Sequence, residues 1–106
     1  MSIQKFMIMI QIKIFGNVSD DVYISLFMTS AGMKYKVFIK GVDTKTADLD
    51  IDVPKRFRKE VMKKYIPSIS GDSGTLPESA NISKELEDFL RECWEEIYNK
   101  EVSLLE

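Results

Sequence analysis

Residues 22–39 read VYISLFMTSAGMKYKVFI, and apolar and polar side chains alternate on both sides of the Ser-Ala-Gly segment at their centre. Successive side chains of a β-strand point to opposite faces of a sheet, so residues of one parity line one face. The short connection makes the two halves antiparallel neighbours. We expect Met28 opposite Met33 and Leu26 opposite Tyr35, so that the stretch forms a hairpin with one apolar face.

The same alternation extends into the flanking segments and predicts a sheet of four strands. The strands are expected at about 5–15, 22–29, 33–40 and 46–53. Their connections are short, which favours an antiparallel meander in the order 1-2-3-4. Parity also predicts the pairing of the last two strands, with Lys36 opposite Asp50 and Lys34 opposite Asp52. Cross-strand pairs of opposite charge stabilise such a register.

Two amphipathic segments follow the strands and predict helices at about 54–66 and 83–100. Proline is favoured at a first helical position, so the first helix is expected to begin at Pro54. Residues 67–80 are rich in Ser, Gly and Pro and predict a long loop. The chain is therefore expected to be a single α+β domain over residues 1–106, with both C-terminal helices packed on one face of the sheet.

Composition excludes several classes of protein. The formal net charge of −2 argues against a dedicated nucleic-acid binder, for which a strongly basic domain is expected. The single cysteine, Cys93, allows no intrachain disulfide, which is compatible with a cytoplasmic protein. The N-terminal apolar run from Phe6 to Ile10 is too short for a signal peptide. No run approaches the roughly 20 apolar residues of a membrane span, so we expect no membrane partner.

The chain contains no histidine, and this absence bears on catalysis. The Gly71-Asp72-Ser73-Gly74 tetrapeptide matches the sequence around the nucleophile of chymotrypsin-like serine proteases. A Ser-His-Asp triad needs an imidazole, so we interpret the tetrapeptide as a turn. The missing histidine also removes the usual neutral-pH acid–base group and, with one cysteine, the common zinc sites. We expect no enzymatic activity and no cofactor.

Three aspartates alternate along the fourth predicted strand, at positions 48, 50 and 52. A row of carboxylates is able to hold Mg²⁺ or Mn²⁺, and a metal-dependent nuclease is one hypothesis for it. The favoured interpretation of Asp48, Asp50 and Asp52 is a solvated edge strand whose charges discourage edge-to-edge pairing, with no metal bound. Cys93 falls on the apolar stripe of the second helix, where a thiol is usually a small core residue.

Charge separates between the two predicted helices. The first carries a basic face opposite its apolar stripe, made of Lys55, Arg56, Lys59 and Lys63. Such a face suits contact with phosphates, although the solvent-exposed side of an ordinary amphipathic helix has the same character. The second helix is acidic. The carboxylates that we expect to meet a partner with a basic surface are Glu92, Glu95 and Glu96.

The outer face of the predicted sheet is not cleanly polar. An apolar patch is expected at Met7, Met9, Phe27 and Phe38, with Met9 aligned to Phe27. Exposed patches of Met and aromatic residues on small proteins mark interfaces. We therefore expect this patch to lie at a homodimer contact or at the surface of a protein partner.

Taken together, these patterns favour a non-catalytic protein-interaction module. The size and charge of a small, acidic, histidine-free α+β domain fit an inhibitor or regulator that occupies a partner's surface, including a phage-encoded protein that opposes host defence by imitating nucleic acid. Two alternatives stay open. One is a nucleic-acid contact module that uses the basic face of the helix at 54–66. The other is a binder or sponge for small molecules that uses the loop at 67–80.

Overall fold

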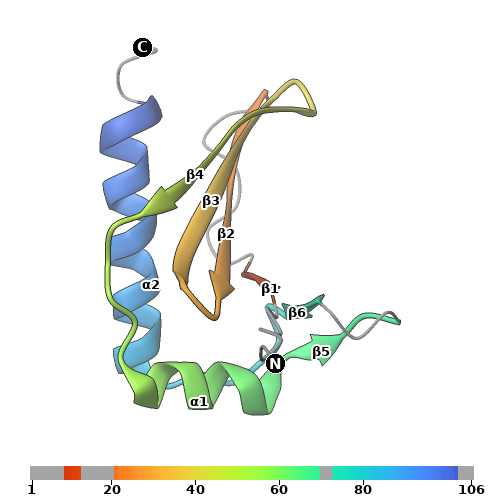
Figure 1. The fold of residues 1–106 in the computed structure, drawn as a ribbon, viewed down its shortest axis with the longest axis vertical. Coiled ribbons are helices and arrows are strands. Elements are labelled where there is room, and N and C mark those ends of the chain that lie inside the picture. The colour runs from red at the N-terminus through yellow and green to blue at the C-terminus, as the bar shows by residue number, and fades with distance from the viewer. Residues whose placement is uncertain (1–8, 13–20, 70–72, 103–106) are drawn as a thin grey trace, which may run out of the picture.

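The computed structural model describes residues 9–12, 21–69 and 73–102, and within them it has an α+β fold with a mixed sheet (Figure 1). The six strands are β1 (Met9–Ile12), β2 (Val22–Thr29), β3 (Gly32–Ile39), β4 (Val42–Leu49), β5 (Ile66–Pro67) and β6 (Ser73–Leu76). The helices are α1 (Lys55–Lys64), α2 (Lys84–Ile97) and a π-helical turn, η1 (Tyr98–Val102).

The spatial order of the strands is β4-β3-β2-β1-β6-β5. The expected antiparallel meander of four strands is therefore present, but the sheet is larger and mixed, because β6 lies parallel to β1. The prediction of one long loop at 67–80 was wrong, because this range contains β6 and the last residue of β5. A four-residue strand that reads SGTL lacks the long alternation that marks the other strands, and its parallel partner is remote in sequence.

The β2–β3 hairpin confirms the expected register. Met28 lies opposite Met33 and Leu26 opposite Tyr35, and all four side chains are buried. These residues supply the centre of the core, where each fully buried large apolar side chain contributes roughly 1.5–3 kcal/mol.

The predicted register of the next hairpin was wrong by four residues at Lys34 and Lys36, because a tight turn closes it. Ile39 pairs with Val42, so only Lys40 and Gly41 form the turn, with φ angles of 53° and 79°. Positive φ at both central residues is the mark of a type I′ turn. β4 consequently begins at Val42 and ends at Leu49, earlier than the predicted strand at 46–53.

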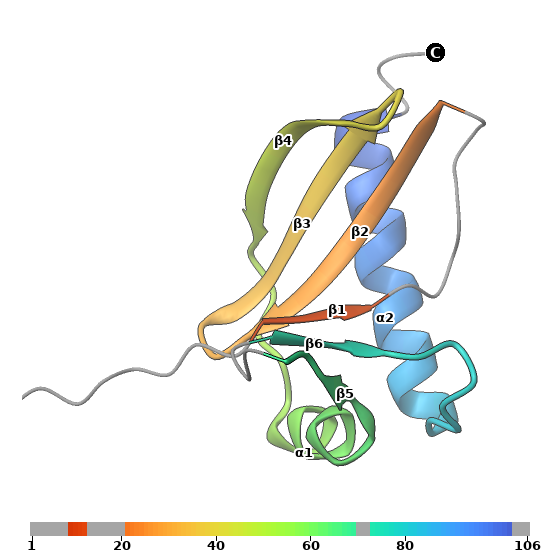
Figure 2. The same ribbon diagram turned by 90° about the vertical axis from the view of Figure 1, so that its right-hand side faces the viewer.

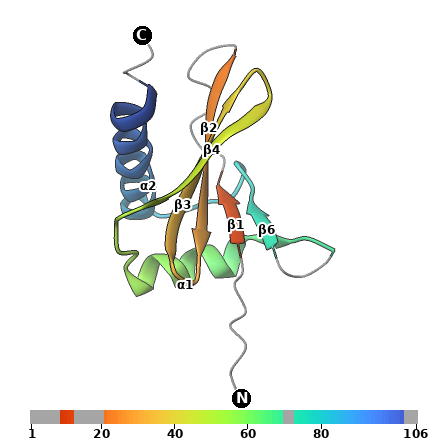
Figure 3. The ribbon, with the colours of Figure 1, turned by 45° about the horizontal axis from the view of Figure 1, so that its top comes forward.

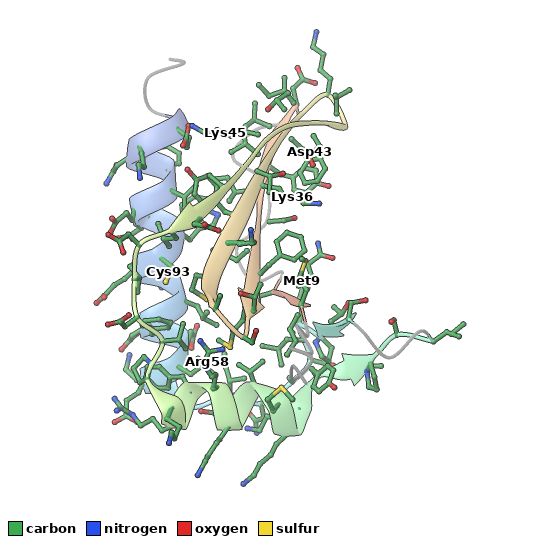
Figure 4. All side chains as sticks on the ribbon, in the orientation of Figure 1. Met9, Lys36, Asp43, Lys45, Arg58 and Cys93 are labelled. Carbon is green, nitrogen blue, oxygen red and sulfur yellow. The ribbon has the colours of Figure 1, made fainter. Side chains whose placement is uncertain are left out.

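The lysines of β3 keep acidic partners, but different ones from those predicted. Lys34 forms an ion pair with Asp48 at 3.1 Å and Lys36 with Asp43 at 3.7 Å. Figure 4 shows Lys36 and Asp43 projecting on the same side of the sheet. A register shift between Val37 and Phe38 accommodates the irregular pairing.

The two helices cover different parts of the sheet. α2 runs along one face of β2 and β3, and its buried residues are Leu86, Leu90, Cys93 and Ile97 (Figures 1 and 2). α1 instead crosses below the β2–β3 turn, so the prediction that both helices pack along one face holds for α2 alone. Buried Phe57 and Val61 of α1 close the end of the same core, and the ring of Phe57 lies 5.1 Å from that of Phe89.

Candidate functional site

The exposed face of α2 is acidic along its whole length. Glu85, Asp88, Glu92 and Glu95 recur at three- and four-residue spacing, so they share one side of the helix, opposite the buried stripe. At a rise of about 1.5 Å per residue, this row presents one carboxylate about every 5 Å. We call this row, together with the adjacent Glu96, the acidic face.

Most of the acidic face has no compensating charge. Asp88 pairs with Lys84 at 3.6 Å, whereas Glu92, Glu95 and Glu96 are exposed and form no ion pair within the described part of the chain. The structure thus brings together the three carboxylates predicted from the sequence and adds Glu85 to them. Because these charges are solvated and unpaired, they are available to a cation-rich surface.

The start of α2 is fastened to α1 through a carboxylate. Glu60 accepts hydrogen bonds from the Ser83 backbone N–H at 2.6 Å and from the Ser83 hydroxyl at 2.8 Å. The Ser83 oxygen in turn accepts from the N–H of Leu86 at 3.2 Å and caps the helix. Burial alone raises the pKa of Glu60, but the hydrogen bonds from Ser83 and Lys64 outweigh it and hold that pKa below its ordinary value.

The far end of α2 is fastened to the sheet. Glu101 of η1 accepts a hydrogen bond from the hydroxyl of Tyr35 on β3, and its two carboxylate oxygens lie 3.0 and 2.8 Å from the Lys45 ammonium on β4. Figure 4 shows Lys45 reaching the end of the helix. The bonds from Lys45 and Tyr35 lower the pKa of Glu101, against the effect of its burial. Burial, reinforced by Glu101, raises the pKa of Tyr35 to about 12.

Sequence reasoning missed this cluster of Tyr35, Lys45 and Glu101. The signal available was the odd position of Tyr35, a buried tyrosine whose hydroxyl must find a partner. The two anchors fix both ends of α2, so the acidic face is a rigid, preorganised surface.

The basic face of α1 is also present as predicted, with Lys55, Arg56, Lys59 and Lys63 all exposed. Within the described residues these four form no ion pair, and the Arg56 guanidinium lies 4.5 Å from the ring centroid of Phe57. The other two cations of α1 turn inward. Arg58 donates to the backbone oxygen of Thr29, and Lys64 donates to Glu60 and to the backbone oxygen of Asn81.

The predicted apolar patch on the outer sheet face is only partly formed. Met7 lies outside the described residues, and Met9, Phe27 and Phe38 are half-buried. The expected alignment of Met9 with Phe27 was wrong, because Phe27 pairs with Gln11. Phe38 stacks on Tyr23 with ring centroids 4.7 Å apart, and the Lys36 ammonium lies 5.4 Å from the centroid of Phe27. The rings of Phe27 and Phe38 therefore already contact neighbouring side chains on this face of the sheet.

A hollow of ≈ 450 Å³ adjoins this patch, between β1, β2 and the β5–β6 hairpin. Its lining includes Met9, Phe27, Ile66 and Ser73. This hollow is the place where the small-molecule hypothesis for residues 67–80 would apply. The Ser73 hydroxyl donates to that of Ser68 at 3.1 Å, and Asp72 lies outside the described residues.

The prediction that the three aspartates form a row on one strand was wrong. β4 ends at Leu49, so only Asp48 belongs to it, and Asp50 and Asp52 follow in the connection to α1. All three line a hollow of ≈ 480 Å³ that also contains Lys34, the ion-pair partner of Asp48. Among the residues described, no group of three acidic, cysteine or histidine side chains is arranged to hold a metal ion.

Cys93 lies in the core, as expected, on the side of α2 that faces the sheet (Figure 4). Burial, with smaller effects from Glu96 and Glu92, raises the pKa of its thiol to about 12. A thiol in this state is a poor nucleophile, because the reactive species is the thiolate.

In the part of the chain that is described, no helix has both the length and the apolar character needed to cross a membrane. No family model matches the chain, and no curated protein and no solved structure is similar to it.

Proposed function

We propose that the protein is a non-catalytic interaction module, acting in the cytoplasm, that binds a protein with a basic surface through the acidic face of α2. The observation that carries the proposal is the group of exposed carboxylates Glu92, Glu95 and Glu96, which form no ion pair within the described residues, on a helix fixed at both ends. A rigid charged surface loses little conformational freedom on binding, which favours affinity.

The spacing of the acidic face supports an inhibitor that imitates nucleic acid. One DNA strand carries a phosphate about every 3.4 Å along the axis. The acidic face carries a carboxylate about every 5 Å, so it is less dense but similarly linear. A protein that binds DNA or RNA through lysine and arginine side chains is the kind of partner that this face fits, and the anti-defence role of a phage-encoded inhibitor is one role compatible with such a partner.

The chemistry of the remaining side chains supports a role without catalysis. The chain has no histidine, and its one thiol is buried with a raised pKa. Among the residues that the structure describes, the Ser73 hydroxyl has the hydroxyl of Ser68 as its hydrogen-bond partner. Binding alone is therefore the activity that we propose.

Charge reversal tests the proposal directly. The tagged chain and the variant E92K/E95K/E96K would be compared in pull-downs from a host lysate, with K55E/K59E/K63E as a matched control on the other helix. We expect one protein to be enriched by the wild type and by the control but lost with the acidic-face variant. Binding of that purified protein should weaken steeply between low and high salt.

Two results would contradict the proposal. One is an enriched partner that is lost with the α1 variant and retained with the acidic-face variant. The other is a purified complex whose affinity is the same at low and high salt. Circular dichroism spectra of the variants verify that both helices remain folded.

A further inference from the structure

Three large apolar side chains are exposed along one stretch that runs from the end of α1 into the β5–β6 hairpin. The exposed fractions are 42% for Met62, 60% for Ile66 and 106% for Ile69. Single exposed apolar residues are ordinary, but three within eight positions form a local patch that marks an interaction site.

The patch lies on a protrusion. The β5–β6 hairpin extends away from the rest of the domain, beside the C-terminal end of α1 (Figures 1 and 3). Its base is held tightly, because Gly74 of β6 leaves room for the ring of Tyr65 at the end of α1. Ile69 is therefore presented on the protrusion, and Ile66 lies nearer its base, where it also borders the hollow of the outer sheet face.

The cations of the basic face lie next to this patch. Lys55, Lys59 and Met62 are spaced i, i+4 and i+7, so they share one side of α1. The one acid of the helix, Glu60, turns inward to Ser83 and does not offset these charges. The exposed side of α1 thus combines positive charge with the apolar side chain of Met62, and Ile66 follows four residues later at the start of β5.

We propose that this surface, made of Lys55, Arg56, Lys59, Met62, Lys63, Ile66 and Ile69, binds the interface of an anionic lipid bilayer. The isoleucines would enter the boundary between headgroups and acyl chains, while the lysines contact anionic headgroups. A fluid bilayer accepts protruding apolar side chains without a complementary pocket. The expectation of no membrane partner was drawn from the absence of a spanning segment, and surface binding needs none.

The position of the acidic face is compatible with this orientation. α2 begins beside α1 and then runs along the sheet, away from α1 (Figure 1). Glu92, Glu95 and Glu96 belong to the second half of α2, which leads away from α1. The inference goes beyond the proposed function and does not rest on it, because the two use different side chains.

Vesicle sedimentation with the full chain tests the proposal. The probes are vesicles of phosphatidylcholine alone and of phosphatidylcholine with phosphatidylserine. We expect binding to the anionic vesicles only, with a steep decrease as salt is added. Removal of charge in K55Q/K59Q/K63Q should weaken binding by about fivefold per lysine.

The apolar contribution has its own variants and controls. We expect I66S/I69S, and I69S alone, to weaken vesicle binding at constant charge; Ile69 is fully exposed, so its replacement leaves the core intact. V42S is the matched control, since Val42 is 61% exposed at the β3–β4 turn. K36Q/K40Q/K100Q changes the net charge by the same amount at positions outside α1, on β3, the β3–β4 turn and η1, and both controls should bind like the wild type.

Three outcomes would overturn the proposal. The first is the absence of binding to anionic vesicles at low salt. The second is equal loss of binding in the control and test variants. The third is binding of single-stranded or duplex DNA, measured by fluorescence anisotropy, that depends on the lysines of α1 and not on Ile66 or Ile69 and that occurs without vesicle binding. The last result would assign the basic face to nucleic acid and would leave the proposal for the acidic face unaffected.

Discussion

Glu101 shows how single side chains determine the geometry of α2. It joins the end of that helix to Tyr35 and Lys45, and its side chain is only 14% exposed. Glu60 has the equivalent role at the other end of α2, where its carboxylate accepts two hydrogen bonds from Ser83. The pKa values of both carboxyl groups are lowered in the folded protein, so the surrounding hydrogen bonds and charges favour the ionised form of each group.

These lowered pKa values predict a pH dependence of stability. A carboxyl group whose pKa is lower in the folded state stabilises the fold above its unfolded-state pKa, and the effect is lost as the pH falls through the folded pKa. We expect Glu101→Gln and Glu60→Gln each to lower the free energy of unfolding at pH 7 by about 1–3 kcal/mol. Urea unfolding should show the difference from wild type shrinking as the pH falls below 4.5, the ordinary carboxyl value. A difference that is constant down to pH 2 would contradict the assignment. Glu95→Gln, on the exposed side of α2, serves as the control.

Gly74 is a second position where a single residue constrains the fold, because the packing around it leaves no room for a Cβ atom. A Cβ at this position would lie 2.4 Å from the ring of Tyr65 and 2.6 Å from the backbone oxygen of Ile66. We expect Gly74→Ala to destabilise the fold by about 1–3 kcal/mol, because the backbone oxygen is unable to move aside. Ser73→Ala, one residue earlier, should stay within about 0.5 kcal/mol of the wild type. Thermal or urea unfolding measures both, and equal stability of G74A and wild type would contradict the predicted clash.

At the scale of elements, sequence patterns predicted those segments that have a strong local period. The β2–β3 register followed from parity, because both strands bury every second side chain. α2 followed from its apolar stripe, which the structure buries. The β5–β6 hairpin did not follow, since β6 has only four residues and its partner β1 lies more than sixty positions away. The anchors at Glu60 and Glu101 depend on tertiary proximity, which no local pattern encodes.

The β3–β4 hairpin illustrates how turn chemistry overrides charge pairing. The predicted register rested on parity and on the charge pairs of Lys34 and Lys36 that agreed with it, but the real one is set by the type I′ turn at Lys40 and Gly41. Asn is more tolerant of positive φ than Lys, so we expect Lys40→Asn to stabilise the protein by a few tenths of a kcal/mol. Gly41→Ala should destabilise it by about 1 kcal/mol, since alanine resists the left-handed region. Denaturant unfolding of the two variants tests the turn assignment, which opposite signs would support. A destabilised K40N would contradict it.

At the scale of the whole molecule, charge and apolar character are distributed over three separate surfaces. The acidic face lies on α2, the basic face on α1, and the half-buried Met9, Phe27 and Phe38 lie on the opposite side of the sheet from α2. A net charge of −2 conceals this arrangement, because the two helices carry opposite charges. The function of each surface is therefore separable by substitution.

The outer sheet face provides the test of self-association. The side chains of Phe27 and Phe38 keep part of their surface in water, and aromatic residues are enriched at the centres of interfaces. We expect sedimentation equilibrium to detect a weak homodimer at high protein concentration, which Phe27→Ser shifts to monomer. The dimer should be weak because Phe38 already stacks on Tyr23 and Lys36 covers part of Phe27. Val42→Ser, at the edge strand β4, should leave the equilibrium unchanged. A monomer at every concentration would show that the contacts of these rings within the chain are sufficient, and the face would then be no interface between copies.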